Sequence, residues 1–333
     1  MINPLYDELF GRHQGEMRPF IQQADGQVMT YNDFLGLASQ YAGLFKKFGL
    51  RPGDRVAVQI EKSPQSLAIY AACVQAGLVF LPLNTAYTAS ELSYFVTDSG
   101  SRVLLCDGKH TASLKPIATA TGAILETMDA DGQGSFSQQA ATMTTKFPTV
   151  ARSKDDLAAF LYTSGTTGRS KGAMLTQENL LSNSQVLTTH WEFTSSDVLL
   201  HALPIFHTHG LFVATNIALL AGSKILLLPK FDLDMIIDLL PQATSMMGVP
   251  TFYTRLLDDS RFTKNLTQHM RLFVSGSAPL LSETHLRFKN RTGHQILERY
   301  GMTETNMNTS NPYKGERRSG TVGFPLPGVE LKI

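Results

Sequence analysis

TSGTTGRSKG (residues 163–172) follows an apolar run, LAAFLY (157–162), and precedes residues with a helical pattern. Its ten residues are two Ser, three Thr, three Gly, one Arg and one Lys. Glycine lets a backbone turn tightly and approach a ligand, and hydroxyls, backbone N–H groups and cations bind anions. A helix beginning behind the loop would add its N-terminus to the binding. The stretch therefore predicts a polyphosphate-binding loop between a strand and a helix.

Two other interpretations of this loop are possible. The Walker A pattern has Gly-Lys-Ser/Thr four residues after its first Gly. Here the residues after Gly165 are TTGRSKG, so that pattern is not met. A flexible surface linker rich in Ser and Gly would have a similar composition. The strand in front, the expected helix behind and the two cations, Arg169 and Lys171, favour phosphate binding.

Short apolar runs alternate with helical patterns along most of the chain. The strand candidates are RVAVQI (55–60), VFLPL (79–83), RVLLCD (102–107), LAAFLYT (157–163), VLLHALP (198–204), KILLLP (224–229), TSMMGVP (244–250) and RLFVSG (271–276). Strands that alternate with helices form βαβ units and mostly parallel sheets. Continuous apolar strands are covered on both faces. We therefore expect an α/β fold.

The chain has 333 residues, more than one hydrophobic core usually serves, so two or more subdomains are expected. Residues 128–156 have weak periodicity and many Gly, Ser, Thr and Gln, which is typical of a connection. We expect a first α/β subdomain over 1–155 and a second over 156–324 that carries the phosphate loop. A further element is expected over 325–333, where PGVELKI resembles the start of a strand.

Composition excludes several classes of function. The formal net charge is +1, so electrostatics give no reason to expect a nucleic-acid or anionic-membrane partner. The two cysteines, Cys73 and Cys106, form no close pair and suit a reducing compartment. No signal peptide is recognisable, and no apolar run approaches the roughly 18 residues of a membrane helix. We expect a cytoplasmic protein.

Two polar turns follow strand candidates in the second half. ERYGMTETNMNTSNP (298–312) places a Thr and an acid beyond a strand end, where they can serve a nucleotide and its metal or form an ordinary turn. FVSGSAPL (273–280) places two Ser and a Gly before a helix. It is no nucleophile elbow, because Ala278 and Pro279 follow Ser277. A helix N-cap at Ser277 is the simpler alternative.

LPIFHTHGLF (203–212) carries His207 and His209. Two histidines at a strand end are half of a metal-hydrolase site, but the other ligands it would need are scattered in the sequence. A histidine packed in the core is the plainer alternative.

GVPTFYTRLL (248–257) places Arg255 in a helix among apolar residues. A guanidinium in such surroundings calls for an anionic partner. The alternative is an Arg whose stem covers apolar surface while its head reaches water, and the local residues alone favour it.

Two of these motifs carry a family resemblance. TSGTTGRSKG and YGMTE (300–304) resemble two signatures of the adenylate-forming (AMP-binding) superfamily, which includes acyl-CoA synthetases, luciferases and the adenylation domains of peptide synthetases. HALPIFHTHGLFVA, MGVPTFYTRLL, MRLFVSGSAPL and ERYGMTETNMNTSNPY are similar to bacterial malonyl-CoA synthetases. The resemblance implies two mostly parallel β-sheets flanked by helices. It also implies that 325–333 begin a truncated β-barrel subdomain, and that the C-terminal domain of the same polypeptide lies outside residues 1–333.

The resemblance implies an ATP-dependent malonate–CoA ligase that works through a malonyl-adenylate, with Mg²⁺ and coenzyme A. Without the C-terminal domain, a fragment is expected to have little or no activity. Amino-acid-activating relatives tend to carry Asp where this chain has His207, which argues against an amino-acid substrate. Ligation of another short acid, such as methylmalonate or acetate, and a nucleotide-binding module without catalysis remain as alternatives.

The resemblance also implies residue roles. The loop residues expected to hold the nucleotide are Thr163, Ser164, Gly165, Thr166, Thr167, Gly168 and Lys171. Further nucleotide contacts are expected from Ser277, Ala278, Pro279, Glu298, Arg299, Tyr300, Gly301, Met302 and Thr303. His207, Thr303 and Glu304 are the expected catalytic residues, and Glu304 with Thr163 would hold Mg²⁺. Arg255 and Ser277 would bind the non-reacting carboxylate of malonate, His207 would border its reacting end, and Met302 is a further expected substrate contact.

Overall fold

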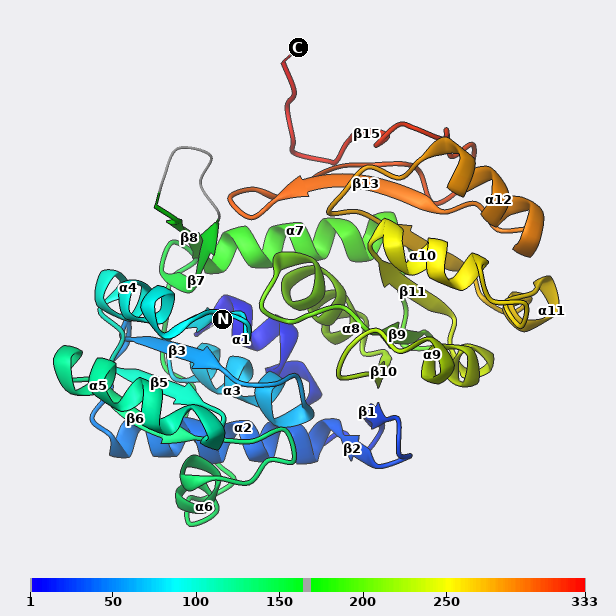
Figure 1. The fold of residues 1–333 in the computed structure, drawn as a ribbon. Coiled ribbons are helices and arrows are strands. Elements are labelled where there is room, and N and C mark those ends of the chain that lie inside the picture. Colours follow the sequence, from blue (N-terminus) through cyan, green and yellow to red (C-terminus); the bar gives the residue numbers. More distant parts are fainter. Residues whose placement is uncertain (1, 164–168, 333) are drawn as a thin grey trace. The chain divides into compact units, whose positions relative to one another are not determined.

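The computed structural model describes residues 2–163 and 169–332, and they form two compact units (Figure 1). Residues 1–18 and 30–181 make up the first unit, and 19–29 and 182–333 make up the second. The boundary therefore lies further along the chain than the expected division at 155. The reason is strand pairing, since the strand Leu157–Thr163 pairs with Val79–Pro82 inside the first unit.

The first unit contains a six-stranded sheet in the order β6-β5-β3-β4-β7-β8. Every neighbouring pair is parallel except β7 and β8. The strands are β3 (Arg55–Gln59), β4 (Val79–Pro82), β5 (Val103–Cys106), β6 (Ile124–Thr127), β7 (Leu157–Thr163) and β8 (Lys171–Thr176). The helices are α1 (Pro4–Leu9), α2 (Tyr31–Lys47), α3 (Pro64–Gln75), α4 (Ala89–Ser99), α5 (Thr111–Thr121) and α6 (Ser135–Ala140).

Local sequence explains where these helices begin and why the sheet is buried. Capping boxes begin α2 at Thr30, α3 at Ser63 and α4 at Thr88, where each hydroxyl accepts a hydrogen bond from the backbone three residues later. Every residue of β4 and β5 is buried, as expected for parallel strands covered on both faces. None of the helices in the described residues is long and apolar enough to cross a membrane.

The glycine-hydroxyl loop connects two antiparallel strands. The sequence predicted a helix behind the loop, and this was wrong: β8 intervenes, and α7 (Gln177–His190) begins only after it. Gly172 explains the pairing, because a Cβ added there would lie 1.8 Å from the Phe160 ring across the hairpin. The loop therefore gains no helix N-terminus, and its two ends are set by the register of Thr163 opposite Lys171.

The second unit contains a nine-stranded sheet in the order β15-β14-β13-β12-β11-β9-β10-β1-β2. The run from β13 to β1 is parallel, whereas β14 and β15 are antiparallel additions. The strands are β1 (Pro19–Gln23), β2 (Val28–Thr30), β9 (Val198–His201), β10 (Lys224–Leu227), β11 (Ser245–Gly248), β12 (Leu272–Ser275), β13 (Leu297–Met302), β14 (Asn306–Ser310) and β15 (Phe324–Pro325). The helices are α8 (Asn216–Ala221), α9 (Leu233–Leu239), α10 (Pro250–Leu257), α11 (Lys264–Thr267) and α12 (Ser282–Thr292). Two mostly parallel sheets flanked by helices are thus confirmed.

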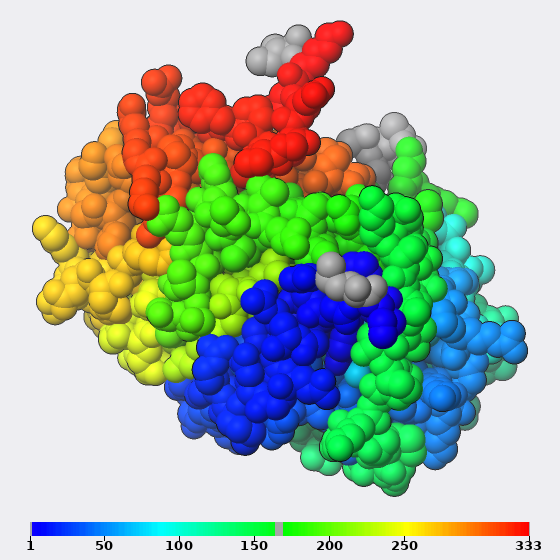
Figure 2. Space-filling view, turned by 180° about the vertical axis from the view of Figure 1, so that it is seen from behind, coloured from blue at the N-terminus to red at the C-terminus, as the bar shows by residue number. Residues whose placement is uncertain are grey.

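The segment after β15 carries no strand as far as residue 332, so the strand expected at PGVELKI is not formed. Its residues are mostly exposed. The segment stands out from the surface of its unit, in red, in Figures 1 and 2.

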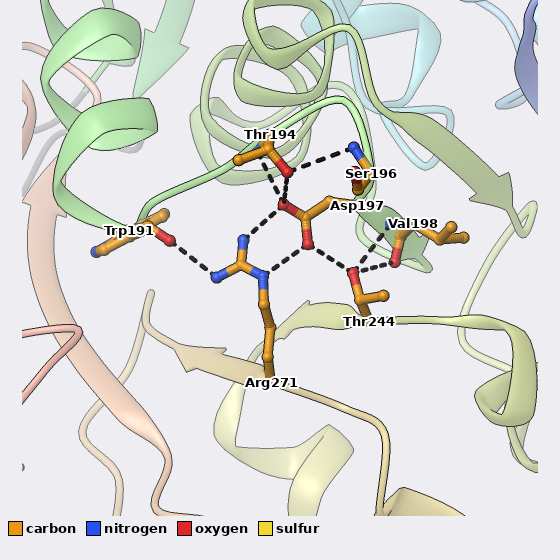
Figure 3. Close-up of polar contacts among 7 residues, drawn as sticks. All are labelled: Trp191, Thr194, Ser196, Asp197, Val198, Thr244 and Arg271. Atoms are coloured by element: carbon orange, nitrogen blue, oxygen red, sulfur yellow. Dashed lines mark hydrogen bonds and ion pairs between the residues drawn. The ribbon is translucent and has the colours of Figure 1, made fainter.

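One charged cluster joins the beginnings of three strands of the second unit (Figure 3). Asp197, which precedes β9, accepts hydrogen bonds from Arg271 Nε at 2.6 Å and Nη2 at 2.9 Å. It also accepts from Thr244 Oγ1 at 2.7 Å and from the Thr194 backbone at 2.8 Å. Burial raises the pKa of Asp197, but these hydrogen bonds outweigh burial and hold the pKa below its usual range.

Asp197→Ala is expected to lower the free energy of unfolding at pH 7 by about 3 kcal/mol, because it leaves the Arg271 guanidinium without its carboxylate. The contribution of Asp197 is present above the ordinary carboxyl pKa of about 3.9 and is lost as pH falls through the lower folded value. Urea unfolding at pH 7 and pH 3, followed by fluorescence of Trp191, the sole tryptophan, measures both effects.

The matched control is Asp258→Ala, because the Asp258–Arg287 pair of the same unit is exposed on both sides. It is expected to change stability by less than about 1 kcal/mol. Equal losses for the two variants would contradict a special role of the Asp197 cluster.

Candidate functional site

The predicted phosphate loop lies in the first unit, and the structure describes its two ends. Ser164, Gly165, Thr166, Thr167 and Gly168 lie outside the described residues. At one end, Thr163 Oγ1 donates to the carbonyl of Lys171 at 3.4 Å. Near the other, the Tyr94 hydroxyl of α4 donates to the Ser170 carbonyl at 2.9 Å, and the Arg169 guanidinium lies 5.4 Å from the Tyr94 ring centre. Both ends are thus tied down, and the Lys171 side chain is exposed to meet a ligand.

The second unit holds two adjoining cavities beyond the carboxyl ends of β9, β11, β12 and β13. This edge of a parallel sheet is where α/β proteins bind ligands. The first cavity, about 350 Å³, is lined by Ser275, Ser277, Ala278, Pro279, Leu280, Glu298, Arg299, Tyr300, Gly301, Gly320 and Val322. The second, about 400 Å³, is lined by Leu203, Pro204, His207, Thr208, His209, Gly210, Val249, Ser277, Arg299, Gly301, Met302, Thr303 and Met307. Ser277, Arg299 and Gly301 line both.

Most residues predicted for the second half therefore come together here. Both polar turns contribute, because β12 and β13 are parallel neighbours and end at the same edge. Ser277 is no helix N-cap, since α12 begins five residues later at Ser282. Ser277 has a φ of +69°, and a left-handed backbone at a residue other than glycine is often found at functional sites.

Arg255 and Glu304 are not among the residues that line these cavities. Arg255 is exposed on α10, and its guanidinium stacks on Phe231 at 4.3 Å from the ring centre. The local residues favoured an arginine that reaches water, and Arg255 is exposed, although it is the guanidinium itself that lies on the aromatic ring. Its contact with a carboxylate stays a prediction. Glu304 is exposed in the turn between β13 and β14.

A β-bulge shapes β13 where it reaches the cavities. The register with β14 shifts between Tyr300 and Gly301. A Cβ on Gly301 would lie 2.3 Å from the carbonyl oxygen of Asn306, so the close approach of the two strands requires glycine. Bulges redirect side chains at strand ends. Here the Tyr300 side chain is left 47% exposed at the first cavity.

Arg299 is the one buried guanidinium that borders both cavities. Its side chain sits at the shared wall, and the residue is only 3% exposed. Its Nε and Nη2 have no hydrogen-bond partner within the described part of the chain, and no carboxylate there pairs with it. Burial lowers the pKa of Arg299 to about 10. A buried cation without an anion is costly, so this arrangement fits a site whose ligand brings the negative charge.

Gly276 makes room for this guanidinium. A Cβ at Gly276 would lie 2.3 Å from Arg299 Cζ and 2.5 Å from Nη1. Any side chain at residue 276 would therefore push the guanidinium away. The glycine in the turn at residues 275–278 thus makes the space that the Arg299 guanidinium occupies.

His209 is buried behind the second cavity. Its Nδ1 lies 3.2 Å from Ser277 Oγ, and its Nε2 has no hydrogen-bond partner in residues 2–163 and 169–332. Burial, followed by the nearby Arg299 charge, holds the pKa of His209 well below its usual range, so the ring is neutral. His207, by contrast, is exposed at this cavity.

Metal ligands do not cluster in the described residues, where no three His, Cys, Asp or Glu side chains are grouped to hold an ion. The His209 ring contacts Ser277 instead. A lone exposed carboxylate such as Glu304 suits Mg²⁺ that arrives with phosphates, because Mg²⁺ keeps several waters and needs few protein ligands.

Sequence reasoning missed three features of this site. It gave His209 no role beyond a metal alternative, it named Arg299 only as a nucleotide contact, and it passed over Gly276. A signal for Arg299 was present in the sequence, since Arg299 lies two residues after the apolar pair Ile296–Leu297. The π-helix that begins at His209 has no pattern by which it could be recognised.

Comparison with known proteins identifies relatives of this chain. The family model described as AMP-binding enzyme matches residues 11–333. The ATP-bound crystal structure of MatB from Rhodopseudomonas palustris is 53% identical, with a TM-score of 0.96 over 98% of this chain and 65% of that one. A malonyl-CoA ligase solved as a ternary product complex with methylmalonyl-CoA and AMP is 32% identical, with a TM-score of 0.80 over 99% of this chain and 67% of that one.

The malonate–CoA ligase of Arabidopsis thaliana is 34% identical over 93% of this chain and 57% of that protein. The chain spans about half the length of the curated relatives it matches.

Arg299→Met is expected to raise the free energy of unfolding of the ligand-free protein, by about 1–4 kcal/mol, because it replaces an unpaired buried charge with an apolar side chain. Urea unfolding followed by Trp191 fluorescence checks this. A loss of stability would show that the guanidinium holds the fold and is not kept for a ligand.

Proposed function

The chain belongs to the AMP-binding enzyme family, and from this premise we propose that it activates malonate with ATP and transfers the malonyl group to coenzyme A. Malonate–CoA ligases from plants and animals and MatB are among its relatives. The family signatures and the two adjoining cavities support an adenylate-forming site. The choice of malonate rests on the charge inside it.

The observation that carries the proposal is the unpaired Arg299 guanidinium between the two cavities. Malonate has two carboxylates, of which one is activated and the other stays charged. The second needs a buried cation, which Arg299 provides. A charge-assisted hydrogen bond contributes about 1.5–3 kcal/mol, which is about one to two decades of preference over acetate. A long fatty acid would leave the guanidinium buried and unpaired, which disfavours it further.

The first cavity is assigned to the nucleotide base. Tyr300 offers an exposed aromatic ring, Ala278 and Pro279 add apolar lining, and Glu298 adds a polar group. Such a mixture of apolar surface and a few polar groups is typical of small-molecule sites. The phosphates are assigned to the loop between β7 and β8, where Thr163 and Lys171 stand at the ends.

In the proposed reaction, a malonate oxygen attacks the α-phosphorus of ATP, and pyrophosphate leaves with the bonding electrons. The thiol of coenzyme A, after losing its proton, attacks the carbonyl carbon of the malonyl-adenylate, and AMP leaves. Neither step requires a covalent bond to the protein. The chain's residues position the reactants and stabilise charge, which accounts for much of the rate of such enzymes.

The individual roles follow from position. Arg299 and Ser277 hold the free carboxylate, and Thr303 is assigned to the reacting end from the turn after β13. His207 borders the same cavity, where the carboxylate and later the thiol meet. Arg255 is assigned to an outer contact with the acyl group. Glu304 would hold Mg²⁺, which neutralises phosphate charge when it is bound.

Methylmalonate is the nearest alternative substrate, because a malonyl-CoA ligase among the relatives was crystallised with methylmalonyl-CoA. Its extra methyl group leaves both carboxylates in place, so it meets the same requirement for a buried cation.

Binding of two hydrolysis-resistant acyl-adenylate mimics, one malonyl and one acetyl, tests the proposal. The malonyl mimic is expected to bind about 10–100-fold more tightly to the wild-type chain. Arg299→Met removes the buried cation and is expected to abolish this preference. Isothermal titration calorimetry measures each affinity, and thermal shift checks that each variant is folded.

Arg255→Ala is the matched variant, because it removes an exposed arginine from the same unit. A small loss of preference in Arg255→Ala beside a complete loss in Arg299→Met is the expected result. Equal affinity of the wild type for both mimics would leave an adenylate-forming protein but refute malonate as its substrate. If neither mimic binds, the assignment of the two cavities is wrong.

A further inference from the structure

The backbone around His209 is held rigidly. His209–Thr215 form a π-helix, a rare element often found at functional sites. A Cβ at Gly210 would lie 2.0 Å from the Pro204 carbonyl oxygen, so the helix packs tightly against the segment after β9. The His201 ring nitrogen Nε2 lies 2.8 Å from the Gly210 carbonyl and 3.2 Å from Thr215 Oγ1. The backbone that carries His209 is therefore closely packed and hydrogen-bonded.

The partner of His209 is also fixed. Ser277 has its left-handed φ of +69° in a turn that contacts Arg299 through Gly276. Its Oγ lies 3.2 Å from His209 Nδ1. Ser277 and His209 both line the second cavity, and Arg299 is at its wall.

The neutral His209 ring can make this hydrogen bond in two ways. With its proton on Nε2, Nδ1 accepts the Ser277 hydroxyl proton, and only oxygen lone pairs are left for the cavity. With its proton on Nδ1, the ring donates to Ser277 Oγ, and the hydroxyl proton is free to point at a ligand. The cavity then presents a second donor beside the Arg299 guanidinium.

A carboxylate distinguishes between these states. It accepts hydrogen bonds and cannot donate one, so the serine lone pairs repel it and the serine proton attracts it. A methyl group in the same place makes neither interaction. A carboxylate ligand therefore stabilises the Nδ1–H state of His209, whereas an uncharged acyl group leaves the two states close in energy.

We propose that His209 is a positioning residue that selects dicarboxylates, because it turns the Ser277 hydroxyl into a donor toward the non-reacting carboxylate. The inference rests on the proposed function and adds to it a residue that acts through another and need not touch the substrate. His209 then differs in role from His207, which stands exposed at the same cavity.

The test compares the malonyl and acetyl adenylate mimics on His209→Leu, His209→Asn and Ser277→Ala. His209→Leu is expected to weaken the malonyl mimic about tenfold, the effect of one lost charge-assisted hydrogen bond, and to change acetyl binding less than about twofold. His209→Asn keeps an N–H donor near Ser277 Oγ and is expected to restore most of the affinity. Adding His209→Leu to Ser277→Ala is expected to cost little more, because the two residues act as one unit.

A spectroscopic measurement separates positioning from mere packing. Histidine ¹⁵N chemical shifts report which ring nitrogen carries the proton, and His209→Leu assigns the signals. The malonyl mimic is expected to give the Nδ1–H tautomer, and the acetyl mimic a mixture.

Finding the Nε2–H tautomer in the malonyl complex would overturn the proposal. Equal losses of affinity for the two mimics in His209→Leu would overturn it as well. If the wild type itself shows no preference for the malonyl mimic, malonate as substrate fails together with this inference. A wild-type preference that survives His209→Leu refutes the role of His209 alone.

Discussion

A buried guanidinium that no carboxylate of residues 2–163 and 169–332 pairs with is the constraint on which the candidate site depends. Arg299 lies in β13 at the carboxyl end of the parallel strands. Its guanidinium fits there because residue 276 is a glycine without a side chain. Few interactions in a folded chain are as unfavourable as a buried charge without a partner. The burial of this charge lowers the free energy of unfolding, and packing in the surrounding sheet has to offset the loss. Binding of an anion beside the guanidinium would offset it further.

The Asp197–Arg271 cluster shows what the same side chain does when it is satisfied. Arg271 directly precedes β12 and donates hydrogen bonds to Asp197 and to the Trp191 carbonyl, so it ties loop and strand beginnings together. Arg299 lies on the neighbouring strand, at the opposite, carboxyl end. One end of the parallel sheet thus carries an arginine paired with a carboxylate, whereas the other carries one that no carboxylate of the described residues pairs with, at the edge where such folds bind ligands.

Much of the fold could be predicted because its signals are local. The buried strands, the capping residues and the two polar turns are each readable within a few residues. The failures all depend on contacts between distant residues. Lys171–Thr176 became a strand because Gly172 packs under Phe160, and β7 joined the first unit because it pairs with β4. No local pattern indicates that Gly276 and Arg299 are in contact, because the turn after β12 and the strand β13 come together only in the folded sheet.

The candidate site shows the same limit at the level of chemistry. Sequence reasoning named two arginines and two histidines but gave the leading roles to Arg255 and His207, which are both exposed. Burial reverses the order, because the strength of a charge or hydrogen bond rises as water is excluded. Arg299 and His209 are the members of each pair that are removed from water, and both approach the Ser277 turn. Under the proposed function, selectivity for a second carboxylate is therefore assigned to the inner pair, and the exposed residues are assigned to the parts of the reactants that reach solvent.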